Sequence, residues 1–590
     1  MKTGLAFGEQ IKTEKIKKRR YSDGVQKFTI RSFLLPLFLL LAIVLLLSRL
    51  FYLQVVKGSD YKTLSDSNRI RTQIIHAPRG VIFDRNGIPL VQNTPGFREI
   101  ISKDKSILLL KDQALPLIAK GDKNLEVDSL REYLYKDSLS HVLGYIGQIS
   151  KDELDSVEFS GYKGTDWVGK SGIEKQYEHI LRGTDGKQLI EVDAIGKKVR
   201  SLGQTDPIPG QDITLTIDSK LQEATYIASK DIKKGAVIVS TPDGQILAMV
   251  SKPNFDPNLF TLDKNYKTAS DSGYTNVVSI LSDTENQPLL NRAIAGIYPP
   301  GSTFKIVVAA SGLENNIIDE SYKIIDTGVI NIGAFSFANW YFTDYGRKEQ
   351  GELNVVRGLA RSNDIFFYKL AEKVGVDSLS KMAEKFGLGA KTGIDLAGEE
   401  TGLVPTVKWK EDHLKEGWYL GDTYHYGIGQ GYLLTTPLQV NSWTQVIANG
   451  GTIYKPWLIK NQVQNNNKNI LSEKTVSLIR QGMIGACSTG GVAWPLFDFG
   501  VKNAKLKIDG KNFLPVASSS AETRKVVIAC KTGTAQHGGE DTKPHAWITL
   551  FAPAYNPQVV ITVLKESSGE GSNEAAPIAK KILEAYFGSN

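Results

Sequence analysis

Residues 298–305 read Tyr-Pro-Pro-Gly-Ser-Thr-Phe-Lys, and the apolar run Ile-Val-Val-Ala-Ala follows them. Two prolines and a glycine predict a rigid turn, and proline is tolerated beside a helix start because the first helical N–H groups lack intrahelical partners. We therefore expect Ser302 to lie in the first turn of a buried helix, with Lys305 on the same face. A helix N-terminus favours developing negative charge, and a neighbouring amine can accept the proton of a serine. This stretch thus has the chemistry of a serine acyl-transferase.

The spacing of this serine and lysine has little specificity by itself. The same Ser-x-x-Lys pattern begins at Ser59, Ser160 and Ser378. Partners elsewhere in the chain must therefore decide whether Ser302 is the catalytic one.

A second candidate motif lies 60 residues later, where residues 360–368 read Ala-Arg-Ser-Asn-Asp-Ile-Phe-Phe-Tyr. Ser362 and Asp364 precede a helical stretch rich in aromatic residues. The pair could contribute to catalysis, or Ser362 could simply cap the N-terminus of that helix.

A third candidate motif is Lys-Thr-Gly-Thr at residues 531–534. The tripeptide Lys-Thr-Gly also begins at Lys2 and Lys391, so the sequence context must separate the three copies. Lys2 lies in the basic N-terminal tail, and Lys391 follows a glycine-rich loop. Only the third copy continues a predicted strand, at residues 525–530.

Strand alternation gives this third motif a defined geometry. It places Lys531 and Gly533 on one face of the strand, opposite Cys530 and Thr532. A glycine there lets a ligand backbone approach closely. The lysine, together with the hydroxyls of Thr532 and Thr534, can hold a carboxylate.

The composition excludes several classes of function. The chain has 590 residues, 41% hydrophobic and 23% charged, which is ordinary for a folded protein of several domains. Its net charge of +8 reflects a basic stretch, residues 12–31, ahead of one apolar segment. We interpret that stretch as a membrane-topology signal and expect no nucleic-acid partner. Neither a His-Glu-x-x-His pattern nor a Walker-type loop occurs, so we expect no metal and no cofactor.

The two cysteines, Cys487 and Cys530, are too few for a disulfide scaffold or a cysteine-based zinc site. They could pair with each other outside the cell. We expect them instead to be buried free thiols, with Cys530 pointing away from the cleft.

Residues 427–431, Gly-Ile-Gly-Gln-Gly, imitate a nucleotide-binding loop. No βαβ pattern surrounds them, and Thr436-Pro437 is typical of a helix start. We therefore expect these glycines to serve packing.

Residues 33–56 are apolar apart from Ser48, Arg49 and Gln54. About 20 such residues span a bilayer as a helix, and no signal-peptide cleavage site follows. We expect an uncleaved single-pass anchor, with residues 1–32 as a cytoplasmic tail and the rest of the chain outside. Arg49 is costly inside lipid, so it either reaches the outer headgroups or contacts a membrane partner.

The rest of the chain predicts two domains. Residues 57–220 indicate an elongated α+β pedestal, which starts with a strand at residues 81–83 and includes a small head subdomain near residues 103–140. Residues 221–590 show strands before and after a central group of helices. That order predicts an α+β domain with helices packed on an antiparallel sheet.

The three motifs, in this order, resemble those of the penicillin-binding protein and serine β-lactamase superfamily. The resemblance covers nearly everything from residue 33 onward and is strongest for class B penicillin-binding proteins. Ser362-x-Asp364 followed by Phe-Phe-Tyr resembles the elongation type, penicillin-binding protein 2, whereas division-type relatives usually carry Ser-x-Asn. Further matching stretches are residues 79–87, 291–293, 427–431, 435–439 and 545–553.

The resemblance implies a D,D-transpeptidase that cross-links peptidoglycan stem peptides. Ser302 would attack the carbonyl between two terminal D-alanines, and Lys305 would accept its proton. Ser362 would relay a proton to the departing D-alanine. An amine from a neighbouring strand would resolve the acyl-enzyme. β-Lactams would acylate the same serine because they mimic the dipeptide.

The resemblance also implies how the substrate is held. Lys531, with Thr532 and Thr534, would bind the terminal carboxylate. The backbone N–H groups of Ser302 and Thr534 would stabilise the tetrahedral oxyanion, each worth roughly 3 kcal/mol in the transition state.

Asp364 poses a chemical problem for this mechanism. A carboxylate beside Lys305 favours the ammonium form, which opposes the work of a base. Burial and the nearby Lys531 act in the opposite direction. The sequence does not rank these effects.

The expected partners are membrane lipid, a RodA-type glycosyltransferase and other proteins of the elongation complex. The region 103–140 is shorter than the head subdomain of typical relatives. Alternatives are a division-type transpeptidase, a β-lactamase or carboxypeptidase, and a β-lactam sensor or non-catalytic scaffold. A bifunctional enzyme would need a carboxylate-centred glycosyltransferase site, and residues 57–220 show none.

Overall fold

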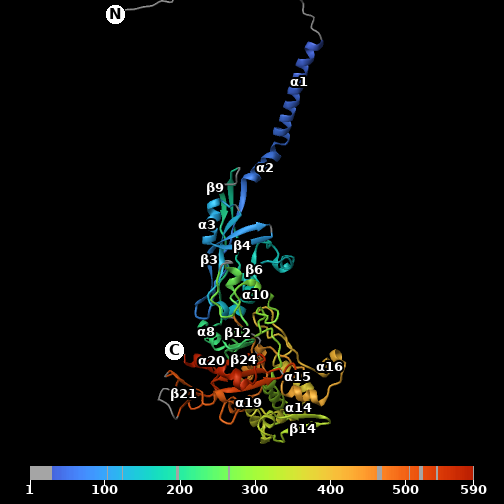
Figure 1. Ribbon diagram of the computed structural model, residues 1–590, viewed down its shortest axis with the longest axis vertical. Coiled ribbons are helices and arrows are strands. Elements are labelled where there is room, and N and C mark those ends of the chain that lie inside the picture. Colours follow the sequence, from blue (N-terminus) through green and yellow to red (C-terminus); the bar gives the residue numbers. More distant parts are fainter. Residues whose placement is uncertain are drawn as a thin grey trace, which may run out of the picture. The chain divides into compact units, whose positions relative to one another are not determined.

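The computed structural model describes residues 30–102, 104–122, 124–193, 198–262, 266–460, 468–503, 505–516, 523–539 and 542–588 (Figure 1). The chain divides into two compact units. The first comprises residues 1–72 and 189–202, and the second comprises residues 73–188 and 203–590.

The first unit contains the predicted membrane segment. Helix α1 (Ile30–Phe51) continues through one π-helical turn (Tyr52–Val56), and α2 (Gly58–Arg69) follows. Within these helices, Leu34–Val56 is long and apolar enough to cross a membrane and is not buried against the rest of the chain. The guanidinium of Arg49 lies 5.4 Å from the ring centroid of Tyr52. The predicted cytoplasmic tail lies outside the described residues, apart from the first residues of α1.

A five-stranded sheet lies in the region before residue 220. The strand order is β10-β2-β3-β4, and β5 pairs with β3. The predicted strand near residue 82 is confirmed as β2, and Asp84 accepts the N–H groups of Asn86 and Ile88 in the turn between β2 and β3. The region of the expected head subdomain contributes β4, α3 and β5. The bounds are β2 Ile82–Phe83, β3 Pro89–Ser102, β4 Lys105–Leu110, α3 Lys111–Lys120, β5 Leu125–Tyr133 and β10 Ile213–Thr214.

Smaller elements complete the region before residue 220. Strands β1, β8 and β9 form a three-stranded sheet in that order, and β6 pairs with β7. Two short helices, α6 and α7, lie between β7 and β8. The bounds are β1 Ile70–Ile75, α4 Ser140–Leu143, β6 Ile146–Gln148, α5 Lys151–Leu154, β7 Trp167–Gly169, α6 Gly172–Gln176, α7 Glu178–Leu181, β8 Gly186–Val192 and β9 Lys198–Thr205.

The C-terminal region is built on an antiparallel five-stranded sheet with the order β12-β11-β24-β23-β22. Side chains alternate between its two faces. Trp547 and Phe551 pack into a core with α11 and α18, whereas Ile548 and Leu550 pack into a second core with α8 and α20. The predicted arrangement of helices on an antiparallel sheet is confirmed. The bounds are α8 Ser219–Ala228, β11 Gly235–Ser240, β12 Ile246–Lys252, α11 Lys305–Glu314, α18 Pro437–Ala448, α19 Glu473–Ala486, β22 Ala529–Ala535, β23 His545–Ala552, β24 Val559–Lys565 and α20 Ala576–Gly588.

The predicted continuous strand at residues 525–531 is wrong. It is two strands: β21 ends at Val526 and joins a separate sheet of order β19-β21-β20, and β22 begins at Ala529 in the main sheet. The remaining elements are α9 Asn258–Thr261, α10 Val277–Ser282, β13 Ile324–Asp326, β14 Val329–Ile332, β15 Phe335–Ala338, α12 Trp340–Asp344, β16 Gly351–Leu353, α13 Val355–Ala360, α14 Asp364–Val374, α15 Val376–Lys385, α16 Val407–Leu414, α17 Leu420–Gly427, β17 Thr452–Ile453, β18 Lys468–Asn469, β19 Gly500–Lys502, β20 Phe513–Pro515 and β21 Thr523–Val526.

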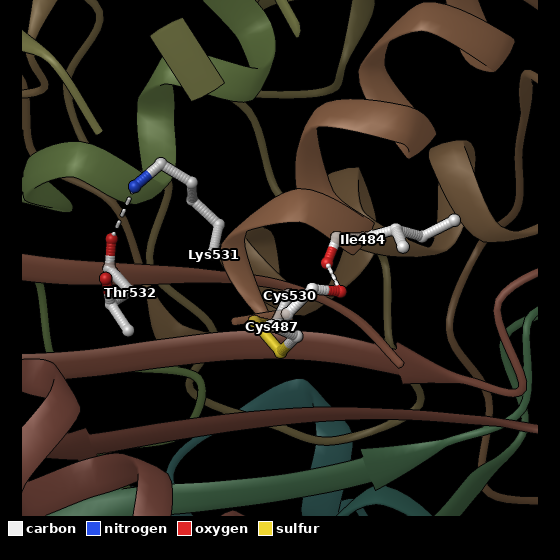
Figure 2. The surroundings of a disulfide bond; sticks show 6 residues. Ile484, Cys487, Cys530, Lys531 and Thr532 are labelled. Atoms are coloured by element: carbon white, nitrogen blue, oxygen red, sulfur yellow. Dashed lines mark hydrogen bonds between the residues drawn. A yellow bond between two sulfur atoms is a disulfide. The ribbon is translucent and has the colours of Figure 1, made fainter. Parts of the chain in front are cut away.

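Cys487 and Cys530 form a disulfide, so the expectation of two free thiols is wrong. Cys487 is the C-cap of α19, which places it over β22, with the two Cα atoms 5.8 Å apart. That separation suits a disulfide. The expected direction of Cys530 is confirmed: it belongs to the core beneath α20, and Figure 2 shows the Lys531 side chain extending away from the disulfide.

Candidate active site

Ser302 lies at the start of a buried helix, as predicted. Residues Gly301–Phe304 form one 3-10 turn, and α11 continues directly from it. Ser302 is half-buried, and every α11 residue from Lys305 to Leu313 is buried. The nucleophile candidate is therefore held on a rigid element, with its side chain at the surface of the core.

The glycine-rich segment 427–431 packs behind this turn. The N–H of Gly301 donates to the carbonyl of Gly429 at 2.9 Å. Gly429 has φ +77°, and a Cβ there would lie 2.1 Å from the carbonyl oxygen of Gly301. Only glycine allows such a close approach. The prediction that these glycines serve packing is confirmed.

Lys305 is fully buried, and its bonds lead to the second motif. Its Nζ donates to Asp364 Oδ1 at 2.6 Å, to the carbonyl of Ser362 at 2.8 Å and to Ser362 Oγ at 3.4 Å. Burial lowers the pKa of Lys305, and this effect exceeds the opposing influence of the Asp364 carboxylate. Of the two opposing effects that the sequence did not rank, burial is therefore the larger.

Ser362 stands between two lysines. Lys531 is fully buried, and its Nζ donates to Ser362 Oγ at 2.8 Å and to the carbonyl of Thr532 at 2.9 Å. Burial, together with the charge of Lys305, holds the pKa of Lys531 well below its usual value. The Ser362 oxygen therefore accepts from both amines, while its own O–H stays available for a third partner.

Ser362 does not cap α14, so that interpretation is wrong. The N-cap is Asn363, whose Oδ1 accepts the Phe366 N–H at 2.8 Å. Ser362 instead ends α13 in the left-handed conformation, with φ +52°. Its N–H bonds to the carbonyl of Leu359, and the next N–H bonds to that of Gly358. This is a Schellman motif with serine at the position that glycine normally occupies.

A left-handed backbone conformation strains a non-glycine residue such as Ser362, and strain of this kind concentrates at functional sites. We expect Ser362→Gly to be more stable than Ser362→Ala by about 1 kcal/mol, because glycine adopts positive φ without steric cost. Both variants lose the hydroxyl, so both should acylate with a β-lactam about a hundredfold more slowly than the wild type. Thermal unfolding and stopped-flow acylation measure the two effects. Equal stability of the two variants would contradict the strain at Ser362.

Strand β22 places the third motif beside the turn that carries Ser302. A Cβ at Gly533 would lie 3.0 Å from both the carbonyl oxygen of Pro300 and Thr303 Cγ2, so packing also requires this glycine. A Cβ at Gly301 would lie 2.9 Å from the carbonyl oxygen of Thr534. In an antiparallel strand the N–H and C=O of one residue point to the same side. The N–H of Thr534 therefore also faces the turn that carries Ser302.

The predicted site residues thus converge in one place. Not every contact that the proposed chemistry needs is present between them. The bonds of Lys305 Nζ found in the described part of the chain go to Ser362 and Asp364 rather than to Ser302. Resting enzymes commonly have such loose contacts, which tighten with substrate. The hydroxyl of Thr534 accepts the Gly571 N–H at 3.4 Å. Among the described residues, no cluster of His, Cys, Asp or Glu is arranged to hold a metal ion.

Comparison with known proteins supports what this geometry indicates. Residues 234–584 match the penicillin binding protein transpeptidase domain, and residues 122–215 match the penicillin-binding protein dimerisation domain. The peptidoglycan D,D-transpeptidase MrdA of Acinetobacter baumannii is 32% identical, over 93% of this chain and 86% of that protein. The chain belongs to the class B penicillin-binding proteins.

Solved structures of class B penicillin-binding proteins are similar to this chain as well. Pseudomonas aeruginosa PBP2 in complex with WCK 5153 superposes with a TM-score of 0.66 at 32% identity, covering 88% of this chain and 96% of that one. Helicobacter pylori PBP2 in complex with MreC gives a TM-score of 0.71 at 28% identity, covering 88% and 99%. Within class B, these relatives confirm the elongation type over the division type.

Sequence reasoning missed the residues that hold Asp364 in this class B site. The N–H of Trp340 donates to Asp364 Oδ2 at 2.9 Å, and Asn339 Oδ1 accepts the Asp364 N–H at 3.2 Å. Both residues lie more than 20 positions before the motif, in a stretch with no recognisable pattern. The fold alone brings them together.

We expect Asp364→Asn to acylate with a β-lactam within about tenfold of the wild type. Removing the carboxylate removes an influence that raises the pKa of Lys305, so the acid limb of the acylation profile should move to lower pH. Acylation rates measured across pH check both statements. A loss of several orders of magnitude would show that the charge itself is required.

Proposed function

We propose that this D,D-transpeptidase cross-links stem peptides through an acyl-enzyme on Ser302. Lys305 takes the serine proton as the oxygen attacks the carbonyl between two terminal D-alanines. Ser362 then passes a proton to the nitrogen of the departing D-alanine. The observation that carries the proposal is the position of Ser362 Oγ, which accepts from Lys531 at 2.8 Å and from Lys305 at 3.4 Å. A hydroxyl between two amines of lowered pKa suits proton relay.

We further propose that the N–H groups of Ser302 and Thr534 stabilise the oxyanion, because the edge of β22 faces the nucleophile turn. Lys531, with the hydroxyls of Thr532 and Thr534, binds the terminal carboxylate, and Gly533 keeps the strand close to the turn. An amine from a second stem peptide enters in place of the D-alanine, attacks the acyl carbonyl and regenerates Ser302. β-Lactams acylate the same oxygen.

We assign residues 33–56 as a single-pass anchor in the bacterial inner membrane, residues 57–220 as the pedestal and residues 221–590 as the catalytic domain on the extracytoplasmic side. The basic residues ahead of the anchor support this orientation. The Cys487–Cys530 disulfide supports it independently, because disulfides persist in oxidising compartments.

We also propose partners in the elongation complex. The similar H. pylori PBP2 has been solved with MreC, which supports an MreC-type partner for this chain. A RodA-type glycosyltransferase would supply the uncross-linked strands, with Arg49 and the helix around it as one contact surface. Arg49 lies within the apolar span, where a charged side chain needs a partner or the interface.

A direct test uses the full-length protein in detergent with un-cross-linked glycan strands that carry pentapeptide stems. We expect cross-linked muropeptides, with one D-alanine released for each cross-link, and no product from Ser302→Ala. Release of D-alanine without cross-links would identify a carboxypeptidase. Rapid turnover of penicillin would identify a β-lactamase.

A further inference from the structure

Asp326, the last residue of β13, is a fully buried carboxylate close to the second motif. Four neutral N–H groups donate to it. Its Oδ1 accepts the Gly328 N–H at 2.7 Å. Its Oδ2 accepts the Gln350 N–H at 3.0 Å, Asn339 Nδ2 at 3.0 Å and Asn363 Nδ2 at 2.9 Å. A buried charge is costly unless such donors satisfy it, so this carboxylate determines where all four groups lie.

Asn339 links Asp326 to Asp364, so that the position of one carboxylate restricts the position of the other. Because Asn339 Nδ2 is committed to Asp326, its Oδ1 points to the other side and accepts the Asp364 N–H at 3.2 Å. The next N–H, from Trp340, donates to Asp364 Oδ2 at 2.9 Å. The other carboxylate oxygen of Asp364 is then presented to Lys305, at 2.6 Å.

Asn363 carries the same restraint to Ser362. Asn363 is fully buried between the two functional residues of the motif. Its Nδ2 donates to Asp326, and its Oδ1 caps α14. These two bonds fix the residue that follows the strained, left-handed Ser362. Strain of this kind persists only where the surroundings over-determine the conformation.

We propose that Asp326 is a positioning residue of the active site. Through its two asparagine partners it holds the Ser362–Asp364 turn against Lys305. This inference rests on the proposed function, since it assigns Asp326 a role through groups that perform the chemistry. No amide can replace the carboxylate, because the NH2 group introduced by Asp326→Asn would face other donors.

The test compares Asp326→Asn with Asp84→Asn in the full-length protein. Asp84 is a matched control: it is also fully buried and organises a turn, between β2 and β3 of the pedestal, by accepting the Asn86 and Ile88 N–H groups and the Ser219 hydroxyl. We expect Asp326→Asn to lower the second-order rate constant of β-lactam acylation by between about tenfold and a hundredfold. Asp84→Asn should leave that rate constant within about twofold, whatever it does to thermal stability.

Two further readouts separate positioning from a merely structural role. The charged groups facing Lys305 are Asp364, which favours its ammonium form, and Lys531, which disfavours it. Loosening Asp364 should therefore move the acid limb of the acylation profile to lower pH in Asp326→Asn. The penalty for Ser362→Ala should also shrink in the Asp326→Asn background, because Ser362 is already displaced there.

Asn339→Ala removes the link to Asp364 while leaving Asp326 its other donors, and it carries the test if Asp326→Asn does not fold. We expect the same shift of the acid limb, with a smaller loss of rate. Unchanged rate and pH profile in a folded Asp326→Asn, or failing that in Asn339→Ala, would overturn the proposal. A wild-type protein that penicillin does not acylate would instead overturn the proposed function, and this inference with it.

Discussion

Lys305→Met should slow the acylation of Ser302 by a β-lactam about ten-thousand-fold, the upper end of what a positioned proton acceptor supplies. The side chain is fully buried, and burial lowers its pKa, which favours the neutral form that can accept a proton. Methionine fills a similar volume but accepts no proton. Stopped-flow or quenched labelling with a reporter β-lactam measures the rate.

A control is needed because Lys305→Met leaves Asp364 without its cation, at a site where the two groups are 2.6 Å apart. Breaking such a buried pair costs about 3–5 kcal/mol of stability. The double variant Lys305→Met/Asp364→Asn removes the uncompensated charge. It should recover thermal stability without recovering acylation. If either variant acylates within about tenfold of the wild type, Lys305 is not the base.

Replacing both Cys487 and Cys530 with alanine should lower the free energy of unfolding by about 4 kcal/mol. This value follows from the loop-closure entropy of a disulfide across a sequence separation of 43 residues. The bridge ties the end of α19 to β22 directly before Lys531. The folded fraction of the variant should still be acylated, because Cys530 packs into the core on the face of the sheet opposite the Lys531 side chain (Figure 2). Urea unfolding followed by intrinsic fluorescence measures the loss.

The wild-type protein provides the control for this prediction. Under denaturing conditions without reductant, iodoacetamide should label neither cysteine, and after reduction it should label both. Reduction should lower the stability of the wild type and leave the double variant unchanged. Two reactive thiols in the unreduced wild type would contradict the disulfide.

The sequence predicted those parts of the site that local patterns encode. The Pro-Pro-Gly turn before Ser302 and the apolar helix after it are local signals, and the structure confirms both. Strand alternation likewise predicted that Lys531 and Cys530 point to opposite faces of β22. The three weak motifs are specific for the family only through their order and context.

The predictions that proved wrong concern residues whose contacts depend on packing between distant parts of the sequence. The Cys487–Cys530 bond depends on α19 ending above β22, and nothing in the sequence places one element over the other. Ser362 looked like a helix cap because serine favours that position, yet the C-terminus of the preceding helix determines its conformation. Asp326 makes one local contact, with Gly328, but its other three partners, Asn339, Gln350 and Asn363, lie 13 to 37 residues away in the sequence.

Peptide mapping tests most directly whether Ser302 is the nucleophile. The full-length protein is incubated with penicillin, digested and examined by tandem mass spectrometry. We expect one penicilloyl adduct per chain, on Ser302 alone, and none on Ser302→Ala. An adduct on any other residue, or one that survives in Ser302→Ala, would contradict the account.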